Sequence, residues 1–172
     1  MKPDESELGY RPCVGVMLLN AQGLVWIGRR AEGRYQQPEG PGSWWQMPQG
    51  GIDANEEPAA AALRELWEET GIRSARIIAE MPGWQTYDLP EPLVGKVWGG
   101  RYRGQRQKWF LARFEGSDSE IDIVPGDGHE VEFDAWRWAP LEDLVDLIVP
   151  FKREVYRAVI AELGPLVRPT AD

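Results

Sequence analysis

Three glutamates stand close together near the middle of the chain, at a spacing that could support chemistry. Glu65, Glu68 and Glu69 occupy positions i, i+3 and i+4, which places side chains on one face of an α-helix. Like charges at this spacing destabilise a helix by roughly a few tenths of a kcal/mol per pair, so stability does not favour the arrangement. The cluster is either a solvated charged surface or a set of oxygen ligands for a hard divalent cation such as Mg²⁺ or Mn²⁺.

The helix that carries the glutamates is predicted over residues 57–70. Pro58 suits its first turn, the alanine run favours helix, and Gly71 fits the left-handed position that ends one. Five side chains fall on one arc of the helical wheel and form the predicted buried stripe: Ala59, Leu63, Leu66, Trp67 and Thr70. The glutamates occupy a mostly opposed arc. Only Ala61 and Ala62 lie between them, which leaves room for a ligand to approach.

A glycine turn precedes the helix, and its bare backbone can approach a metal ion or a phosphate closely. Gly50 is followed after five residues by Glu56, and after seven more by residues 64–72, Arg-Glu-Leu-Trp-Glu-Glu-Thr-Gly-Ile. This stretch matches the Nudix box at every defined position over 23 consecutive residues. A nine-position match at fixed spacing is far more specific than a short motif, and the chain therefore resembles the Nudix hydrolases.

The resemblance implies metal-dependent cleavage of a nucleoside diphosphate linked to another group. The residues that it assigns to the metal are Gly50 (through its carbonyl), Glu65, Glu68, Glu69 and, outside the box, Glu132. It also implies that Arg64 orients a glutamate through a salt bridge, and that Glu56 braces the loop against the helix that Gly71 ends. Metals in such a site neutralise phosphate oxygens and activate a water, which the carboxylates deprotonate. Glu132 is a candidate general base, and the alternative is one more surface acid.

The similarity continues outside the box and narrows the family. The matching segments, in chain order, are Gly9–Pro12, Trp45–Gly51, Gln107–Phe110, Glu132–Asp134, Trp136–Trp138 and Phe151–Arg153. Over roughly residues 9–163 the chain resembles the bacterial RNA pyrophosphohydrolases and the related dinucleoside polyphosphate hydrolases. The first group, by this resemblance, removes pyrophosphate from 5′-triphosphorylated RNA to leave a 5′-monophosphate, which promotes mRNA decay.

Six residues are predicted by the resemblance to bind the substrate: Arg11, Arg30, Tyr87, Lys108, Phe151 and Lys152. Arg11, Arg30 and Lys152 match basic positions that face the phosphates or the first nucleotides. Phe151 and Arg30 are expected to stack on a base from two sides, a contact that tolerates any base because every base has a π-face. Tyr87 contributes to the same pocket in this interpretation. For each of the six, packing or an ordinary surface position is the alternative.

Three other functions are alternatives to this one. A hydrolase of dinucleoside polyphosphates such as diadenosine tetraphosphate needs the same metal cluster and a base-stacking pocket, so the box does not separate it from the RNA enzyme. A hydrolase of small nucleoside triphosphates also fits the box. A catalytically silent Nudix module that binds nucleotides typically lacks one or more box glutamates, and here all are present.

The predicted elements around the box give the fold class. Seven runs have the composition of strands: Cys13–Leu19, Leu24–Arg30, Trp44–Pro48, Arg76–Glu80, Trp84–Tyr87, Lys108–Phe114 and Trp136–Ala139. A second helix is predicted over 151–163. We expect an α+β fold of the Nudix type, an α/β/α sandwich with a mixed central sheet. It forms one domain over 9–163, with flexible tails at 1–8 and 165–172.

Two glycine-rich segments are predicted to be loops, 32–43 and 94–106. The first lies beside the expected pocket and is longer and richer in Gly and Pro than the connection that the resemblance leads us to expect in enterobacterial relatives. The second carries Arg101, Arg103 and Arg106, and is either a basic flap over RNA or a solvated loop.

Composition excludes several other mechanisms. The 172 residues include one cysteine, Cys13, and one histidine, His129, so the chain cannot hold an internal disulfide, a Cys-based zinc site or a poly-His metal site. The formal net charge of −9 disfavours an extended non-specific grip on nucleic acid. No apolar run is long enough for a membrane span, and we do not expect the polar N-terminus to act as a signal peptide. We expect a cytoplasmic protein without an obligate protein partner.

Overall fold

The computed structural model describes residues 8–31, 44–124 and 131–167. The predicted loop at 32–43, His129 and most of the two predicted tails (1–7 and 168–172) lie outside the described residues. None of the helices in the described ranges has the length and apolar character needed to span a bilayer.

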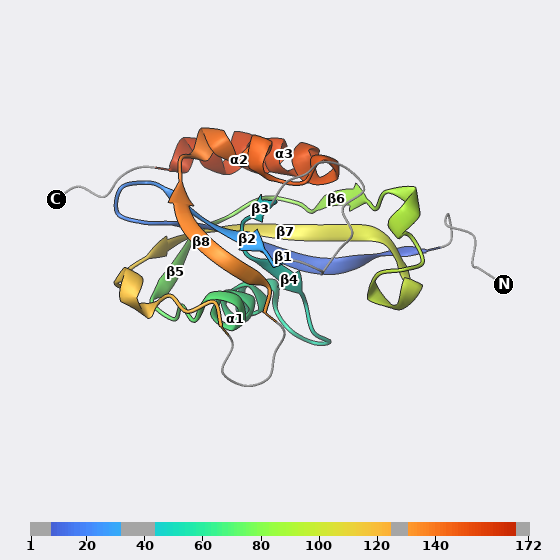
Figure 1. The fold of residues 1–172 in the computed structure, drawn as a ribbon, viewed down its shortest axis with the longest axis horizontal. Helices are drawn as coiled ribbons and strands as arrows, with labels where there is room; N and C mark the ends of the chain where they lie inside the picture. The colour runs from blue at the N-terminus through green and yellow to red at the C-terminus, as the bar shows by residue number, and fades with distance from the viewer. Residues whose placement is uncertain (1–7, 32–43, 125–130, 168–172) are drawn as a thin grey trace.

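A twisted mixed sheet of eight strands forms the centre of the molecule (Figure 1). Its two long strands, β1 (Gly9–Leu19) and β7 (Tyr102–Phe114), run parallel, and every other pairing is antiparallel. The remaining strands are β2 (Val25–Arg30), β3 (Trp45–Gln46), β4 (Gln49–Gly51), β5 (Ala75–Glu80), β6 (Gln85–Asp88) and β8 (Phe133–Ala139). The path β3-β2-β1-β7-β5 is extended by β4 on β1, β6 on β7 and β8 on β2.

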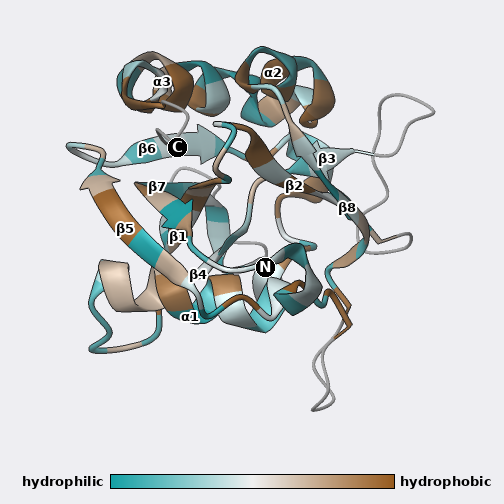
Figure 2. Cartoon of the chain, turned by 90° about the vertical axis from the view of Figure 1, so that its left-hand side faces the viewer, coloured by the Kyte–Doolittle hydropathy of each residue, from teal (hydrophilic) through white to brown (hydrophobic). Residues whose placement is uncertain are grey.

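Helices cover both faces of the sheet (Figures 1 and 2). Helix α1 (Pro58–Thr70) lies on one face, and α2 (Leu144–Leu147) and α3 (Arg153–Leu163) lie on the other. Short 3₁₀ turns include η2 (Glu91–Leu93), η3 (Trp98–Gly100), η4 (Asp118–Glu120), η5 (Leu141–Asp143), η6 (Pro150–Lys152) and η7 (Gly164–Leu166). The α+β sandwich with a mixed sheet is confirmed.

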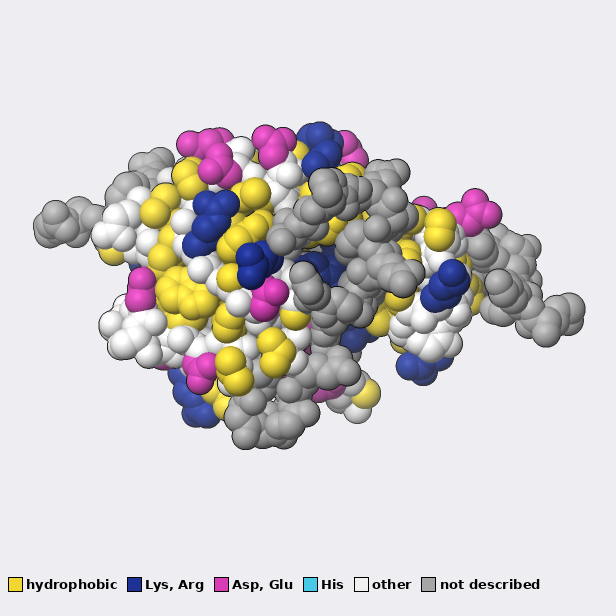
Figure 3. Space-filling view, viewed as in Figure 1, with side chains coloured by type: hydrophobic (Ala, Val, Ile, Leu, Met, Phe, Trp, Pro, Cys, Tyr) yellow, Lys and Arg dark blue, Asp and Glu magenta, His cyan; other side chains and the backbone are white. Residues whose placement is uncertain are grey.

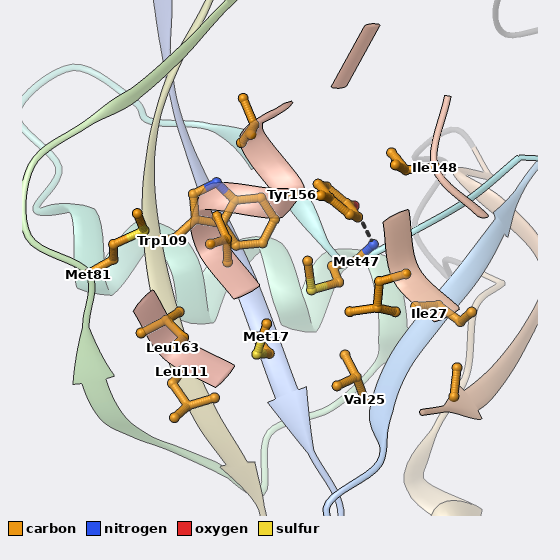
Figure 4. Close-up of a cluster of buried hydrophobic side chains, with 14 of the residues drawn as sticks. Met17, Val25, Ile27, Met47, Met81, Trp109, Leu111, Ile148, Tyr156 and Leu163 are labelled. Atoms are coloured by element: carbon orange, nitrogen blue, oxygen red, sulfur yellow. Dashed lines mark hydrogen bonds between the residues drawn. The ribbon is translucent and has the colours of Figure 1, made fainter. Parts of the chain in front are cut away.

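The larger hydrophobic core lies between the sheet and α3 (Figure 4). Alternate residues of β1 point into it because side chains of a strand alternate between faces. Trp109 of β7 meets Tyr156 of α3 edge to face, with 5.8 Å between ring centres. The buried Tyr156 hydroxyl accepts a hydrogen bond of 2.9 Å from the Met47 backbone N–H. This bond ties α3 to the segment that leads into the Nudix box.

The second core joins α1 to the other face of the sheet and corrects the predicted orientation of the helix. Ala61 and Ala62, expected to lie open between the glutamates, are fully buried, whereas Leu63 and Trp67 of the predicted stripe are 41% and 39% exposed. The helix therefore meets the sheet through small side chains. Alanines have no bulk to hold the helix away, so its backbone can approach β1 and β4 closely.

Long-range pairing extends strands beyond their local sequence signals. The strand predicted from Cys13 begins at Gly9, and the one predicted from Lys108 begins at Tyr102 within the segment expected to be a loop. The two extensions pair with each other, from Gly9 opposite Tyr102 onward. The predicted turn at 49–51 is strand β4 on β1, and helix α2 was not predicted.

Part of the predicted C-terminal tail lies within the described residues. Within the predicted C-terminal tail, Leu166 belongs to the turn η7 and Val167 packs against the larger core. The domain limits of 9–163 remain a prediction.

The single cysteine is a buried thiol of β1, and we predict that it is chemically inert. Cys13 is 0% exposed, and burial raises the pKa of its thiol to about 11. Because the thiolate is the reactive form, labelling by a thiol reagent at pH 8 should require unfolding. Stoichiometric labelling of the native protein within minutes, measured beside a denatured control, would contradict this.

Candidate active site

The Nudix box forms a closed unit in which the loop and the helix touch through Gly50. A β-carbon at Gly50 would overlap the carboxylate of Glu65, so only glycine permits this contact. The buried alanine face of α1 brings the two together, because it sets the helix close to β4. The C-terminal end of the helix is closed by Gly71, which has φ 73° and donates its N–H to the Trp67 carbonyl at 2.8 Å.

Arg64 is the centre of a charged network inside this unit. Its guanidinium donates two hydrogen bonds to Glu56, at 2.8 and 2.9 Å, and one to the Gly51 carbonyl at 2.8 Å. Nη1 also donates to Glu65 at 2.9 Å and to Glu68 at 3.1 Å. One side chain thus joins the loop, the helix start and two of the three box glutamates.

Glu56 connects this network to the loop before the helix. One of its carboxylate oxygens accepts the Asp53 backbone N–H at 3.0 Å, in addition to the bonds from Arg64. The hydrogen bonds from Arg64 and from the Asp53 backbone lower the pKa of Glu56 to about 2. The carboxylate therefore keeps its charge, and its hold on Arg64, well into acid.

This shift predicts a pH-dependent contribution of Glu56 to stability. Because its folded pKa lies below the unfolded value of 4.5, the stabilisation is fully present above about pH 5 and is lost as the pH falls towards 2. Glu56→Gln should lower the free energy of unfolding by about 1–2 kcal/mol at pH 7, after allowing for partial exposure. Urea unfolding of both proteins at pH 7 and pH 3 measures the difference. An equal loss of unfolding free energy at pH 7 and at pH 3 would contradict this prediction.

The glutamates of α1 lie in different surroundings. Burial raises the pKa of Glu65 to about 7. The charge of Glu68 also raises this pKa, whereas the charge of Arg64 lowers it. Glu69 is partly buried and acts electrostatically on Lys152, as Glu132 also does. The helix has no basic residue in its last turn, so the dipole there is not offset by a cation of the helix itself.

These residues match a hard divalent cation in the chemistry of their donors, which are carboxylate oxygens beside an open backbone. As the side chains lie, no three acidic, histidine or cysteine residues in the described ranges are grouped closely enough to hold a metal ion. In this arrangement Arg64, and not a cation ligand site, holds Glu65 and Glu68, since one guanidinium nitrogen donates to both carboxylates. The predicted metal set, Gly50, Glu65, Glu68, Glu69 and Glu132, remains a prediction that requires glutamate side chains to turn towards the ion.

Lys152 brings distant parts of the chain to this region. It is 4% exposed, and its burial, followed by the Arg30 charge, lowers the pKa of the ammonium to about 7. The charges of Glu132 and Glu69 oppose that effect. Residues of β2 and α1, and the residue before β8, therefore lie near the buried ammonium of η6.

Three further residues predicted to bind the substrate, Phe151, Tyr87 and Arg11, lie close to Lys152 or to the Nudix box. Phe151 lies beside Tyr87 of β6, with 5.7 Å between ring centres, and the Lys152 ammonium is 5.5 Å from the Tyr87 ring. Arg11 of β1 lies against Gly51, where a β-carbon would be 2.6 Å from its Nη2, and its charge acts on Glu65.

Lys108 lies apart from these residues. Its ammonium is 3.4 Å from Glu80 and 3.3 Å from the Gly83 carbonyl, to which it donates a hydrogen bond. No contact described for residues 8–31, 44–124 and 131–167 joins it to the other predicted substrate-binding residues. Its proposed role has the least geometric support of the six.

A buried glutamine ladder behind Gly50 was not singled out from the sequence. The Gln107 side chain donates to Gln49 at 3.0 Å and to Gln105 at 2.8 Å, and accepts from the Trp109 indole at 2.9 Å. The ladder links β7 to the residue before Gly50. The alternation of Gln105, Gln107 and Trp109 was the available signal, since such residues share one face of a strand.

The family follows from this fold and this box together. Residues 9–159 match the NUDIX domain, and the chain belongs to the Nudix hydrolases, enzymes that generally use divalent metal ions. Its sequence is 56% identical over 168 residues to the RNA pyrophosphohydrolase of Mesorhizobium japonicum, covering 97% of both chains. It is 55% identical over 166 residues to the RNA pyrophosphohydrolase of Rhodopseudomonas palustris, covering 96% of this chain and 94% of that one.

Solved structures share the fold at much lower identity. The dihydroneopterin triphosphate pyrophosphohydrolase of E. coli superposes with a TM-score of 0.63 at 16% identity, covering 89% of this chain and 98% of that one. The Ap4A hydrolase of C. elegans gives 0.57 at 19% identity, with coverage of 89% and 98%. At this distance the likeness shows the fold alone.

Proposed function

We propose that this protein is a Mg²⁺-dependent RNA pyrophosphohydrolase that removes pyrophosphate from 5′-triphosphorylated RNA and thereby promotes mRNA decay. The observation that carries the proposal is the identity of 55–56% to relatives of that name over nearly their whole length. The intact box supports it, because Glu65, Glu68 and Glu69 are all present beside Gly50. Such an activity belongs in the cytoplasm.

In this proposal the acidic residues hold divalent metal and direct the attacking water. When bound, Mg²⁺ or Mn²⁺ supplies neutralisation of the phosphate oxygens. Glu65, Glu68 and Glu69 provide oxygen donors from the helix, and Glu132, the residue before β8, provides another. Arg64 fixes the positions of two of them through its hydrogen bonds.

The basic and aromatic residues bind the RNA end. Lys152 and Arg30 lie near Glu69 and Glu132, where a triphosphate would supply the negative charge that two neighbouring cations favour. Arg11 approaches from the side of Gly51. Phe151 offers a ring for base stacking, a contact that discriminates little between bases.

A competition assay tests the proposal. Short 5′-triphosphorylated RNA and diadenosine tetraphosphate are offered to the protein at equal concentration with Mg²⁺, and both products are followed. Preferential conversion of the RNA to its 5′-monophosphate form supports the proposal. Preferential cleavage of the dinucleotide overturns the proposal in favour of a dinucleoside polyphosphate hydrolase. If neither substrate is cleaved, the proposal is overturned, and the remaining alternatives are a hydrolase of small nucleoside triphosphates and a catalytically silent module.

Phe151 should affect binding more than folding. Its ring is only partly buried and packs on Tyr87 at the edge of the larger core. We expect Phe151→Ala to raise the KM for triphosphorylated RNA about tenfold, as loss of one base stack costs about 1–3 kcal/mol. Steady-state kinetics and thermal unfolding on the same preparation distinguish the two effects. An unchanged KM together with a much lower Tm would show that Phe151 serves core packing and not substrate binding.

A further inference from the structure

Arginines and aromatic side chains gather at the end of the sheet where β1 and β7 begin. We call this group the arginine–aromatic surface, and its principal members are Arg11, Trp84, Trp98, Arg101, Arg103 and Arg106. They come from β1, β7, the residue before β6 and the turn η3, which lie together at one end of the molecule (Figure 1).

Each arginine of this surface lies over an aromatic ring. The Arg106 guanidinium is 4.3 Å from the centre of Trp84, and that of Arg11 is 5.5 Å from Trp98. Arg101 and Arg103 lie at 5.7 and 5.2 Å from the neighbouring rings of Tyr102 and Tyr10. Stacking holds these flat cations in place at the surface, where they can contact phosphates.

The charge of this region is opposite to that of the whole protein. Residues 92–114 contain six lysines and arginines and no acidic residue, in a chain of formal net charge −9. Figure 3 shows Lys and Arg side chains beside hydrophobic ones at this end, to the right of the view. Arg103 is paired with Asp88 at 3.2 Å, whereas within the described residues Arg101 and Arg106 form no ion pair. Their charge is thus available to an anion.

The surface is continuous with the candidate active site through Arg11. The guanidinium that lies over Trp98 also lies against Gly51, the residue that follows Gly50 in the box. An RNA whose 5′ end reaches the box therefore has a path of positive charge and of exposed or partly exposed rings leading away from it. Single-stranded RNA is held by this combination of arginine contacts to phosphates and base stacking on aromatic rings.

We infer that the arginine–aromatic surface binds the nucleotides that follow the 5′ end of a single-stranded RNA. The inference rests on the proposed function, because it assigns this face to the body of the same substrate. It makes the enzyme sensitive to RNA length. A substrate of two nucleotides uses only the active site, whereas one of about twelve nucleotides also spans the surface.

Turnover of the two RNA lengths tests the inference. Unstructured 5′-triphosphorylated RNAs of two and about twelve nucleotides are compared on the wild type and on Arg101→Gln with Arg106→Gln. The matched control is Arg73→Gln with Arg76→Gln, which removes two exposed arginines outside the arginine–aromatic surface. Arg73 is also stacked on a tryptophan, with its guanidinium 4.8 Å from the centre of the Trp67 ring. We expect the surface variant to lower kcat/KM for the long RNA about five- to tenfold and to reduce its salt dependence, with the short RNA unaffected. The control variant should behave as the wild type.

A binding measurement separates this inference from the proposed function. Fluorescence anisotropy with 5′-monophosphorylated RNA of about twelve nucleotides needs no catalysis. Weaker binding by the surface variant alone supports the inference even if no RNA is hydrolysed, a result that would end only the proposed function. Hydrolysis of RNA with equal kcat/KM for both lengths, and equal binding by all three proteins, would overturn the inference and leave the proposed function intact.

Discussion

Glu69→Gln should lower turnover by about a hundredfold or more while leaving the fold intact. The substitution keeps the size of the side chain and removes one oxygen donor and one negative charge. Glu69 is outside the hydrogen-bond network of Arg64 that the structure describes, so the loop and the helix stay joined. Catalysis suffers more than stability because the developing charge of the reaction depends on the metal that the carboxylates are proposed to hold.

Glu57→Gln is the matched control for this experiment. It makes the same change at the start of the same helix, where Glu57 is exposed and its side chain makes no capping hydrogen bond. Both variants are compared by kcat, by the Mg²⁺ concentration that gives half-maximal rate, and by thermal unfolding. A Glu69→Gln protein with near-normal kcat would remove Glu69 from the proposed metal ligands.

Arg64→Ala should damage both stability and activity. Its guanidinium binds Glu56, Glu65, Glu68 and the Gly51 carbonyl, and its removal leaves a buried carboxylate at Glu65 without its cation. We expect a loss of about 2–4 kcal/mol in the free energy of unfolding, typical of breaking a buried charged network. We also expect kcat/KM to fall about ten- to a hundredfold, as when residues that orient metal ligands are removed.

Arg64→Lys and Arg76→Ala make this prediction specific. Lysine keeps the charge but cannot form the bidentate hydrogen bonds that Arg64 makes to Glu56. Arg64→Lys should therefore be more stable than Arg64→Ala but less stable than the wild type. Arg76 forms an exposed ion pair with Glu115, and its loss should change stability by less than about 1 kcal/mol. Urea unfolding and steady-state kinetics give both quantities. Wild-type behaviour of Arg64→Lys in both would show that charge alone, and not the geometry of Arg64, matters.

The Nudix box could be predicted from the sequence because its determinants are local. Helix α1, its end at Gly71 and the spacing of the glutamates depend on residues within about two dozen positions of one another. The salt bridge of Arg64 also lies within this stretch. The C-terminal helix was predicted for the same reason, since its buried positions repeat at helical spacing.

The rotation of α1 against the sheet was decided by tertiary packing. The helical wheel favoured the large side chains Leu63 and Trp67, but the fold buries Ala61 and Ala62 instead. A wheel weighs hydrophobicity and takes no account of how closely a helix approaches its neighbour. The close approach is what brings Glu65 against Gly50.

Only the tertiary structure could bring together residues from separate parts of the chain. The sequence by itself determined the family motif, the helix that carries it and the exclusion of an internal disulfide and of a poly-His metal site. The fold decided that Arg30, Glu69 and Glu132 lie near Lys152 and that Lys108 pairs with Glu80. It also decided that β1 and β7 extend together to build the arginine–aromatic surface. The physical reason is that strand pairing and charge proximity depend on non-local contacts, which local composition does not encode.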